Sequence, residues 1–152
     1  MMKKQKRLIM MRGPSGSGKT TFAKDKYPDA IHCSADEYFE DLADLNGTTY
    51  ADEFQPWLLS QAHQHCYNQF IHAIKIDEPI VVIDNTNICI WEMENYVLLA
   101  SHFGYKIEVQ AMPKQNPHTL AERNAHGVPL HIIERQMKNY EHAPWYYGDD
   151  EE

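Results

Sequence analysis

Hydrophobic residues along the chain follow two different patterns. Uninterrupted apolar runs at positions 8–11 and 80–83 are typical of short strands buried in a parallel sheet. Two further strands are expected at 29–33 and 105–111, and the second of these alternates apolar and polar residues, as a more exposed strand does. Helical patterns separate the four runs, so the sequence predicts an α/β fold with a mainly parallel sheet of about four strands and right-handed crossovers.

The expected helices differ in how clearly they are marked. Apolar residues recur three or four positions apart from 57 to 76, which predicts a long amphipathic helix. Ser34 and Glu37 have the spacing of a capping box, so another helix is expected to begin there and to end before the polar stretch 46–56, interpreted as a loop. Further helices are expected over 20–26, 90–102, weakly over 119–124, and from Pro129 as first position to Tyr140.

The chain has 152 residues, of which 43% are hydrophobic and 24% charged, and this composition predicts a single soluble domain over 1–152. Its apolar runs are far shorter than the roughly 20 residues of a membrane span, so no membrane association is expected. The four-residue run behind the basic start is also too short for a signal peptide. Three scattered cysteines without a C-x-x-C pair predict neither a disulfide framework nor a zinc ribbon, and favour a reducing, cytoplasmic setting.

The net charge of −8 argues against tight, non-specific binding of nucleic acid, although it is compatible with a local basic channel. Residues 1–6 are interpreted as a basic solubilising arm, and 143–152 as an aromatic and acidic tail. The triplet 145–147 of that tail either packs on the core or stacks on a base. His63 and His65 lie two positions apart on different helix faces, so no histidine metal site is expected, and nothing predicts an oligomeric state.

The segment GPSGSGKT at 13–20 matches the phosphate-binding loop pattern G-x-x-x-x-G-K-[ST] at every fixed position. It lies between an expected strand and an expected helix, the order that this motif requires. Backbone N–H groups of such a loop surround phosphates, its lysine reaches the outer phosphates, and its hydroxyl ligates magnesium. The predicted nucleotide-binding residues are Gly13, Ser15, Gly16, Ser17, Gly18, Lys19, Thr20 and Thr21.

Two aspartates follow expected strands and should therefore lie at the carboxyl edge of the sheet, near this loop. Asp84 ends the run 80–83, where an acid holds magnesium together with Thr20; the alternative is an Asx turn that closes the strand. Asp36 lies in the first turn of a helix, where it is positioned to deprotonate an acceptor hydroxyl; the alternative is an acid favoured by the helix dipole. Thr86 and Asn87 are assigned to the same phosphate or substrate site.

Residues 114–128 are expected to form a small lid over the phosphates. Arg123 suits charge stabilisation on a transferring phosphoryl group, because its guanidinium matches a pair of phosphoryl oxygens. The alternative is an ordinary solvated arginine on a helix. His126 is assigned to the phosphate or substrate site, and Arg135 lies downstream.

Four segments, at 13–21, 34–39, 82–87 and 123–129, together resemble one known family. Their order and spacing are similar to those of the P-loop kinase domain of polynucleotide 5′-hydroxyl kinases. Within that group, the chain most resembles the polynucleotide-kinase-like ATPase domains of a family of ubiquitin-ligase-binding proteins and their bacterial and phage relatives. The resemblance extends over nearly the whole chain.

The resemblance implies roles for individual residues. Lys19 and Thr20 would bind the phosphates of ATP and magnesium, Asp36 would be the general base toward a 5′-hydroxyl, Asp84 would support the phosphate site, and Arg123 would belong to the lid. Two positions depart from the family pattern. Phage-type enzymes carry an arginine for the substrate's 3′-phosphate where this chain has Phe39, whose ring is expected to pack on a base or sugar. Their lid has a further arginine where this chain has His126 and Gly127.

The sequence therefore predicts phosphoryl transfer that depends on ATP and Mg²⁺, with Lys19, Asp36 and Arg123 as catalytic residues. The expected acceptor is the 5′-hydroxyl of a polynucleotide or nucleotide. Two alternatives stay open: a kinase of a small, nucleoside-like hydroxyl compound, and an ATP-binding or ATPase module with a regulatory or scaffold role.

Overall fold

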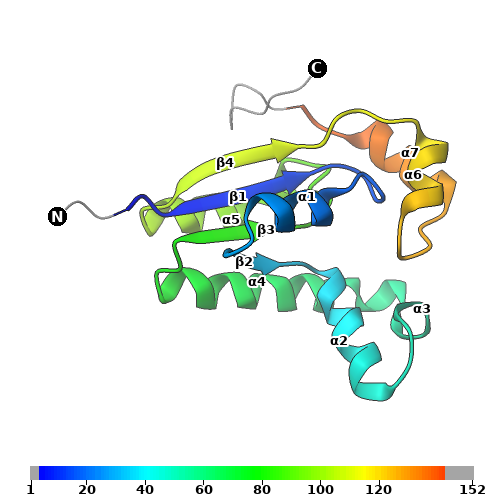
Figure 1. The fold of residues 1–152 in the computed structure, drawn as a ribbon, viewed down its shortest axis with the longest axis horizontal. Coiled ribbons are helices and arrows are strands. Elements are labelled where there is room, and N and C mark those ends of the chain that lie inside the picture. The colour runs from blue at the N-terminus through cyan, green and yellow to red at the C-terminus, as the bar shows by residue number, and fades with distance from the viewer. Residues whose placement is uncertain (1–3, 143–152) are drawn as a thin grey trace.

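In the computed structural model, which describes residues 4–142, four parallel strands form one sheet with helices on both faces (Figure 1). The strands are β1 (Arg7–Arg12), β2 (Ile31–Cys33), β3 (Ile80–Ile83) and β4 (Lys106–Ala111). Their order across the sheet is β2-β3-β1-β4, and each neighbouring pair runs parallel. The predicted α/β fold with a four-stranded parallel sheet is confirmed.

The helical segments of the described residues alternate with these strands or follow the last of them. They are α1 (Lys19–Lys26), α2 (Asp36–Asn46), α3 (Tyr50–Glu53), the 3-10 turn η1 (Pro56–Leu58), α4 (Leu59–Lys75), α5 (Trp91–His102), α6 (Pro117–Arg123) and α7 (Leu130–Asn139). In Figure 1, α2 and α3 lie at the same end of the sheet as α6 and α7, below them in this view.

Strand β1 is the centre of the core, because successive residues of a strand point to opposite faces of the sheet. Leu8 and Met10 are fully buried in a cluster with residues of α2, α4 and α5. Ile9 and Met11 are fully buried on the opposite face, in a cluster that includes Ala23 of α1. The starts of β1 and β3 are level in the sheet, since Arg7 pairs with Ile80, and β1 continues past the partner of Ile83 to Arg12. Because the two strands are parallel, the loops that follow them leave from the same edge of the sheet.

Three details at the starts of helices differ from the sequence-based expectation. Ser34 forms no capping box; Ala35 is the N-cap residue of α2, and its N–H donates a 2.9 Å hydrogen bond to the Asn85 side chain. That contact with a residue fifty positions away fixes the entry to the helix, which local spacing does not reveal. The stretch interpreted as a loop contains α3, whose capping box is formed by Thr49 and Asp52. Pro129 is the N-cap of α7 and not its first residue.

Other expectations from composition concern the surface and the termini. Among residues 4–142, no helix combines the length and apolar character that a membrane crossing requires. Cys33, Cys66 and Cys89 are free thiols. Within the expected basic arm, Lys6 forms a 2.8 Å ion pair with Asp77. Residues 1–3 and the whole tail 143–152, including its aromatic triplet, lie outside the described part of the chain.

Candidate functional site

The segment 13–18 links the end of β1 to the first residue of α1. Gly13, Gly16 and Gly18 have φ angles of 153°, 81° and 90°, which only glycine adopts readily, so the glycines of the motif are required by the backbone. Helix α1 begins directly at Lys19, and its N-terminal N–H groups and positive dipole end therefore face the loop. This geometry is suited to binding an anion such as a phosphate.

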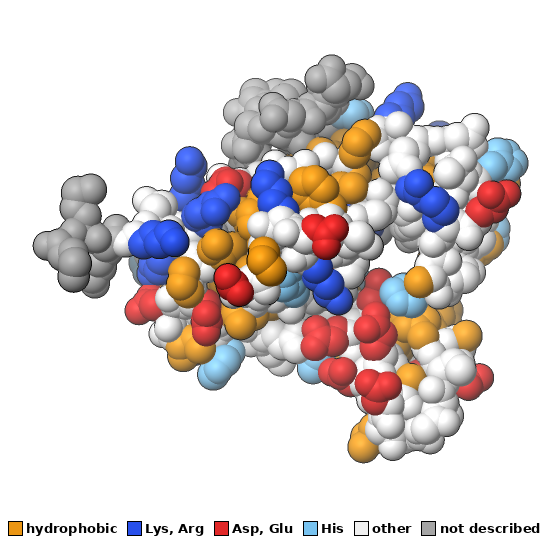
Figure 2. Space-filling model, in the orientation of Figure 1, with side chains coloured by type: hydrophobic (Ala, Val, Ile, Leu, Met, Phe, Trp, Pro, Cys, Tyr) orange, Lys and Arg blue, Asp and Glu red, His pale blue; other side chains and the backbone are white. Residues whose placement is uncertain are grey.

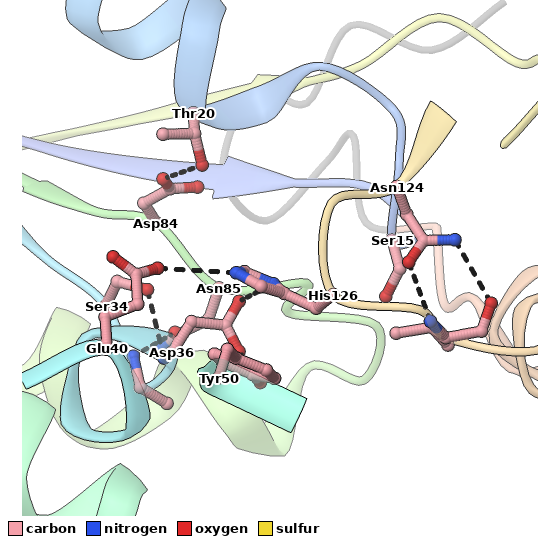
Figure 3. Close-up of polar contacts among 12 residues, drawn as sticks. Ser15, Thr20, Ser34, Asp36, Glu40, Tyr50, Asp84, Asn85, Asn124 and His126 are labelled. Atoms are coloured by element: carbon pink, nitrogen blue, oxygen red, sulfur yellow. Dashed lines mark hydrogen bonds and ion pairs between the residues drawn. The ribbon is translucent and has the colours of Figure 1, made fainter. Parts of the chain in front are cut away.

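Thr20 and Asp84 lie together at the start of α1 and the end of β3. The Thr20 Oγ1 donates a 2.6 Å hydrogen bond to the Asp84 Oδ2 (Figure 3). Asp84 is only 7% exposed, and its Oδ1 has no hydrogen-bond partner among the described residues. A hydroxyl and a carboxylate with a free oxygen are the kind of hard ligands that Mg²⁺ uses when phosphates and water complete its shell. The residues present therefore fit magnesium.

The Lys19 side chain lies beside these groups and donates a 3.1 Å hydrogen bond to the carbonyl oxygen of Pro14. Burial lowers the pKa of Lys19 below its ordinary value, while the carboxylates of Asp84 and Asp36 act in the opposite direction. Lys19 therefore lies within electrostatic reach of both predicted carboxylates, which are almost fifty residues apart in sequence.

Asp36 is surrounded by aromatic and charged side chains from α2, α3 and the lid (Figure 3). The Tyr50 hydroxyl donates a 2.7 Å hydrogen bond to the Asp36 Oδ1, and the His126 Nδ1 lies 3.4 Å from the Asp36 Oδ2. The His126 Nε2 lies 3.4 Å from the Glu40 Oε1, and the His126 ring stacks on Tyr50 at a centroid distance of 3.9 Å. Burial alone would raise the pKa of Asp36, but these contacts to His126 and Tyr50 hold it below its ordinary value.

Side chains of the lid donate hydrogen bonds to carbonyl oxygens of the phosphate loop. Arg123, which is exposed, donates to the Gly16 carbonyl at 3.3 Å and to the Gln115 side chain. Gln115 in turn donates to the Ser17 carbonyl at 3.2 Å. The structure thus brings Arg123 to the loop and gives its guanidinium a backbone partner there.

The other predicted site residues take different positions. The Thr86 carbonyl accepts a 3.0 Å hydrogen bond from the Gly13 N–H, and the buried Asn87 donates a 2.7 Å hydrogen bond to the Met11 carbonyl, so both brace the base of the loop. Thr21 is exposed on α1. Ser17 is buried, and its Oγ has no hydrogen-bond partner within residues 4–142.

Phe39 does not face the site, contrary to the expectation that its ring packs on a base or sugar. Its side chain is fully buried, and its ring lies 5.5 Å from that of Tyr50 and 5.1 Å from that of Phe54. The expectation is wrong because Phe39 is part of the main core cluster, where Tyr50 and Phe54 pack against its ring.

Sequence reasoning missed several residues that support the site. Tyr50 lies in the stretch interpreted as a loop, although the Thr49–Asp52 capping box could have indicated a helix start there. Gln136 of α7 accepts a 2.9 Å hydrogen bond from the Ser15 N–H and donates to the Ser15 hydroxyl at 3.2 Å. Arg12 is fully buried at the end of β1 and donates to the carbonyl oxygens of Asn87, Ile88 and Glu141.

A cavity of ≈ 650 Å³ adjoins the phosphate loop on the side of β4 and α7. Its lining includes Gly13 and Pro14 of the loop, Met112 after β4, and Met137 and Tyr140 at the end of α7. The volume and the apolar lining of this cavity are those of a site for a small organic group.

Comparison with known proteins shows the family of this chain. A family of AAA domains, AAA_33, matches residues 8–143. The chain belongs to this family. Human NEDD4-binding protein 2 is 34% identical over 140 residues, which cover 88% of this chain but only 8% of that protein.

Solved structures of lower identity share the fold. A chain of the Pnkp1/Rnl/Hen1 complex is 17% identical with a TM-score of 0.57, over 81% of this chain and 40% of that one. A gluconokinase from Sinorhizobium meliloti 1021 is 15% identical with a TM-score of 0.53, over 98% of this chain and 83% of that one. The AAA domain thus shares its fold with these proteins, one of which is a kinase.

Proposed function

We propose that this AAA domain transfers the γ-phosphoryl group of ATP to a hydroxyl acceptor, and that the acceptor is the 5′-hydroxyl of a polynucleotide or nucleotide. The observation that carries the proposal is the position of Lys19 within reach of two carboxylates, Asp84 and Asp36. Binding of magnesium and nucleotide needs the first carboxylate. A second carboxylate, held ionised near the phosphates, is needed to accept the proton of the acceptor hydroxyl.

Each residue has a defined part in the proposed reaction. The backbone N–H groups of 13–18 and Lys19 hold the triphosphate, and Thr20 and Asp84 hold Mg²⁺, which when bound neutralises phosphate charge. Asp36 accepts the proton of the acceptor hydroxyl. The acceptor oxygen forms a bond to the γ-phosphorus, the bond from that phosphorus to the bridging oxygen breaks, and ADP leaves. The low pKa of Asp36 favours its ionised form, which is the form that accepts this proton.

Arg123 and the cavity beside the loop complete the proposed nucleotide site. The hydrogen bond of Arg123 to the Gly16 carbonyl keeps a guanidinium beside the loop, where it stabilises charge on the transferring group. The cavity next to Gly13 takes the nucleoside, because Met112 and Tyr140 offer apolar surface to a base.

A small hydroxyl compound is a second candidate acceptor, and the surface charge of α2 favours it. Figure 2 shows acidic side chains gathered over α2, beside the hollow between α2 and the lid. Glu40 and Asp41 there have side chains that are 54% and 59% exposed, and Asp44 is also exposed. These carboxylates repel a long phosphodiester chain more than a nucleoside. The four-segment resemblance favours the 5′-hydroxyl, so the acceptor is the point to test.

The test is a transfer assay with ATP labelled at the γ-position and three acceptors: a 5′-hydroxyl oligonucleotide, a nucleoside 3′-phosphate and a plain nucleoside. We expect label on the oligonucleotide, with no marked preference for a 3′-phosphate because Phe39 replaces the arginine of phage-type enzymes. Asp36→Asn should lower transfer by about 10²- to 10⁴-fold and leave ATP affinity nearly unchanged. Lys19→Ala should abolish productive use of ATP.

Matched controls on α1 separate chemistry from surface charge. Asp25→Asn removes an exposed carboxylate of α1, and Lys24→Ala removes an exposed lysine of the same helix; both should retain full transfer. Label on the nucleoside alone would assign the chain to small-molecule kinases. Tight ATP binding without transfer to any acceptor would refute the kinase proposal and leave a nucleotide-binding module.

A further inference from the structure

Both oxygens of the Asp36 carboxylate are in contact with other side chains, although this carboxylate is the proposed base. Oδ1 accepts the hydrogen bond from Tyr50, and Oδ2 faces the His126 Nδ1 at 3.4 Å. The side chain is still 50% exposed, so an acceptor can approach it. A base needs one oxygen within hydrogen-bond reach of the acceptor hydroxyl. A carboxylate oxygen can accept two hydrogen bonds, so the acceptor either shares an oxygen with one of these side chains or takes the place of that side chain.

The contact with Tyr50 is the one that is held in place. The Tyr50 ring lies edge-on to the fully buried Phe39 at 5.5 Å and stacks on Phe54 at 5.9 Å. Tyr50 is also the first residue of α3, immediately after the capping box formed by Thr49 and Asp52. Movement of the hydroxyl away from Asp36 would disturb both the aromatic cluster and the start of the helix.

The contact with His126 is the one that can be exchanged. His126 lies in the turn after α6, where Asn124 accepts from the Val128 N–H at 2.7 Å and donates to the Val128 carbonyl at 3.1 Å. This turn presents the ring to α2 and α3 from the lid. The ring contacts Asp36 and Glu40 through its two nitrogens and Tyr50 through one face. The His126 side chain is 27% exposed.

We propose that Tyr50 and His126 are positioning residues for Asp36: Tyr50 holds Oδ1 throughout, and His126 occupies Oδ2 until the acceptor hydroxyl takes its place. The inference rests on the proposed function, since it names the oxygen through which the base acts. It adds that the lid and the acceptor compete for the same carboxylate oxygen.

This competition depends on the protonation of His126. Each ring nitrogen faces a carboxylate oxygen at 3.4 Å, Nδ1 toward Asp36 and Nε2 toward Glu40, and only the imidazolium carries an N–H on both. The groups that face the ring are Asp36 and Glu40 from α2 and Tyr50 from α3, while Lys19 acts on Asp36 from the loop. The contact with Asp36 raises the pKa of His126, so the bridge persists above the pH at which a free histidine loses its proton.

The sign of the pH effect follows. As pH rises through the raised pKa of His126, the ring loses one N–H and its positive charge. It can then donate to only one of the two carboxylates, Asp36 or Glu40. The acceptor then displaces it more easily. The acceptor KM should fall by about fivefold between about pH 6 and about pH 9, as expected for loss of one partly exposed ion pair.

Steady-state kinetics across that pH range test the proposal in the full chain. His126→Gln, which keeps a polar side chain but cannot become charged, should remove the pH dependence of the acceptor KM and leave the ATP KM unchanged. Tyr50→Phe keeps the aromatic packing and removes the donor to Oδ1, so the acid limb of kcat should move to higher pH as the pKa of Asp36 rises. His118→Gln replaces another exposed lid histidine and should match wild type. A wild-type pH profile in His126→Gln would overturn the proposal.

A second measurement needs no turnover and so separates this inference from the proposed reaction. The imidazole of His126 is titrated by NMR, its signal assigned by its loss in His126→Gln. We expect a pKa above that of a free histidine, and a lower value in Asp36→Asn. A normal pKa that Asp36→Asn leaves unchanged would refute the His126 contact. If the NMR result is as expected but no acceptor is phosphorylated, the contact stands and the kinase proposal fails.

Discussion

Thr20 and Asp84, sixty-four residues apart in sequence, share a 2.6 Å hydrogen bond that joins the start of α1 to the end of β3. The bond uses one carboxylate oxygen and leaves the other without a partner among the described residues. It brings together the hydroxyl and the carboxylate that a magnesium ion beside the phosphates would use.

Thr20→Ala should therefore weaken binding of Mg²⁺-ATP more than binding of free ATP. Loss of the hydroxyl removes a metal ligand but leaves the loop N–H groups and Lys19 in place. Calorimetric titration with ATP, in magnesium and in excess chelator, measures both affinities. Lys24→Ala changes an exposed side chain further along α1 and serves as the comparison. Equal losses with and without magnesium would mean that Thr20 is no metal ligand.

Asp84→Asn should lower the transfer rate while leaving thermal stability nearly unchanged. The amide retains a hydrogen-bonding partner for Thr20 but lacks the negative charge that holds a divalent cation. Thermal unfolding and transfer assays on the same preparation decide between this prediction and the strand-closing turn. If thermal stability falls while the transfer rate per folded molecule is unchanged, the strand-closing turn is the better explanation of Asp84.

Gly16→Ala should destabilise the fold and displace the lid. A Cβ on Gly16 would lie 2.2 Å from the backbone oxygen of Leu120 in α6, and the φ angle of 81° is itself unfavourable for alanine. Gly47→Ala provides the matched control, since Gly47 also has a positive φ but nothing within 4 Å of an added Cβ. Denaturant unfolding should show a loss of about 1–2 kcal/mol for the control and a larger one for Gly16→Ala. Equal losses would show that α6 moves aside freely.

Arg12→Met should be among the most destabilising substitutions in the chain. Arg12 is fully buried, and three backbone carbonyl oxygens from two loops accept its hydrogen bonds. Removal of the guanidinium leaves these acceptors without their donor, at a cost of about 3 kcal/mol or more. Arg135→Met, at an exposed position of α7, should change the free energy of unfolding by less than about 0.5 kcal/mol. A similar effect of both substitutions would contradict a structural role for Arg12.

The architecture could be predicted because buried strands and amphipathic helices leave periodic signals in the sequence. The run 80–83 is β3 without change of bounds, and the glycine-rich motif lies between β1 and α1 as its pattern requires. Local signals also predicted the carboxyl edge of the sheet as the position of Asp36 and Asp84.

Contacts between distant segments could not be predicted in this way. Ser34 has the spacing of a capping residue, but the Asn85 side chain fixes the chain one residue later. Arg12 follows an apolar run and would ordinarily be assigned to the surface, yet carbonyl oxygens from elsewhere in the chain satisfy it in the core. The pairing of His126 with Asp36 depends on the fold of the lid, which no periodic pattern describes.

The contacts of the lid with the loop carbonyls of Gly16 and Ser17 have a thermodynamic consequence. A peptide group whose carbonyl accepts a hydrogen bond is polarised, and its N–H neighbour on the same unit becomes a stronger donor. Gln115 therefore polarises the peptide unit between Ser17 and Gly18, whose N–H lies at the start of α1. The unit that Arg123 contacts has its own N–H bonded to the Pro14 carbonyl at 3.2 Å. Docking of the lid on the loop and binding of the nucleotide are then thermodynamically coupled. Each of these two processes raises the equilibrium constant of the other by the same factor.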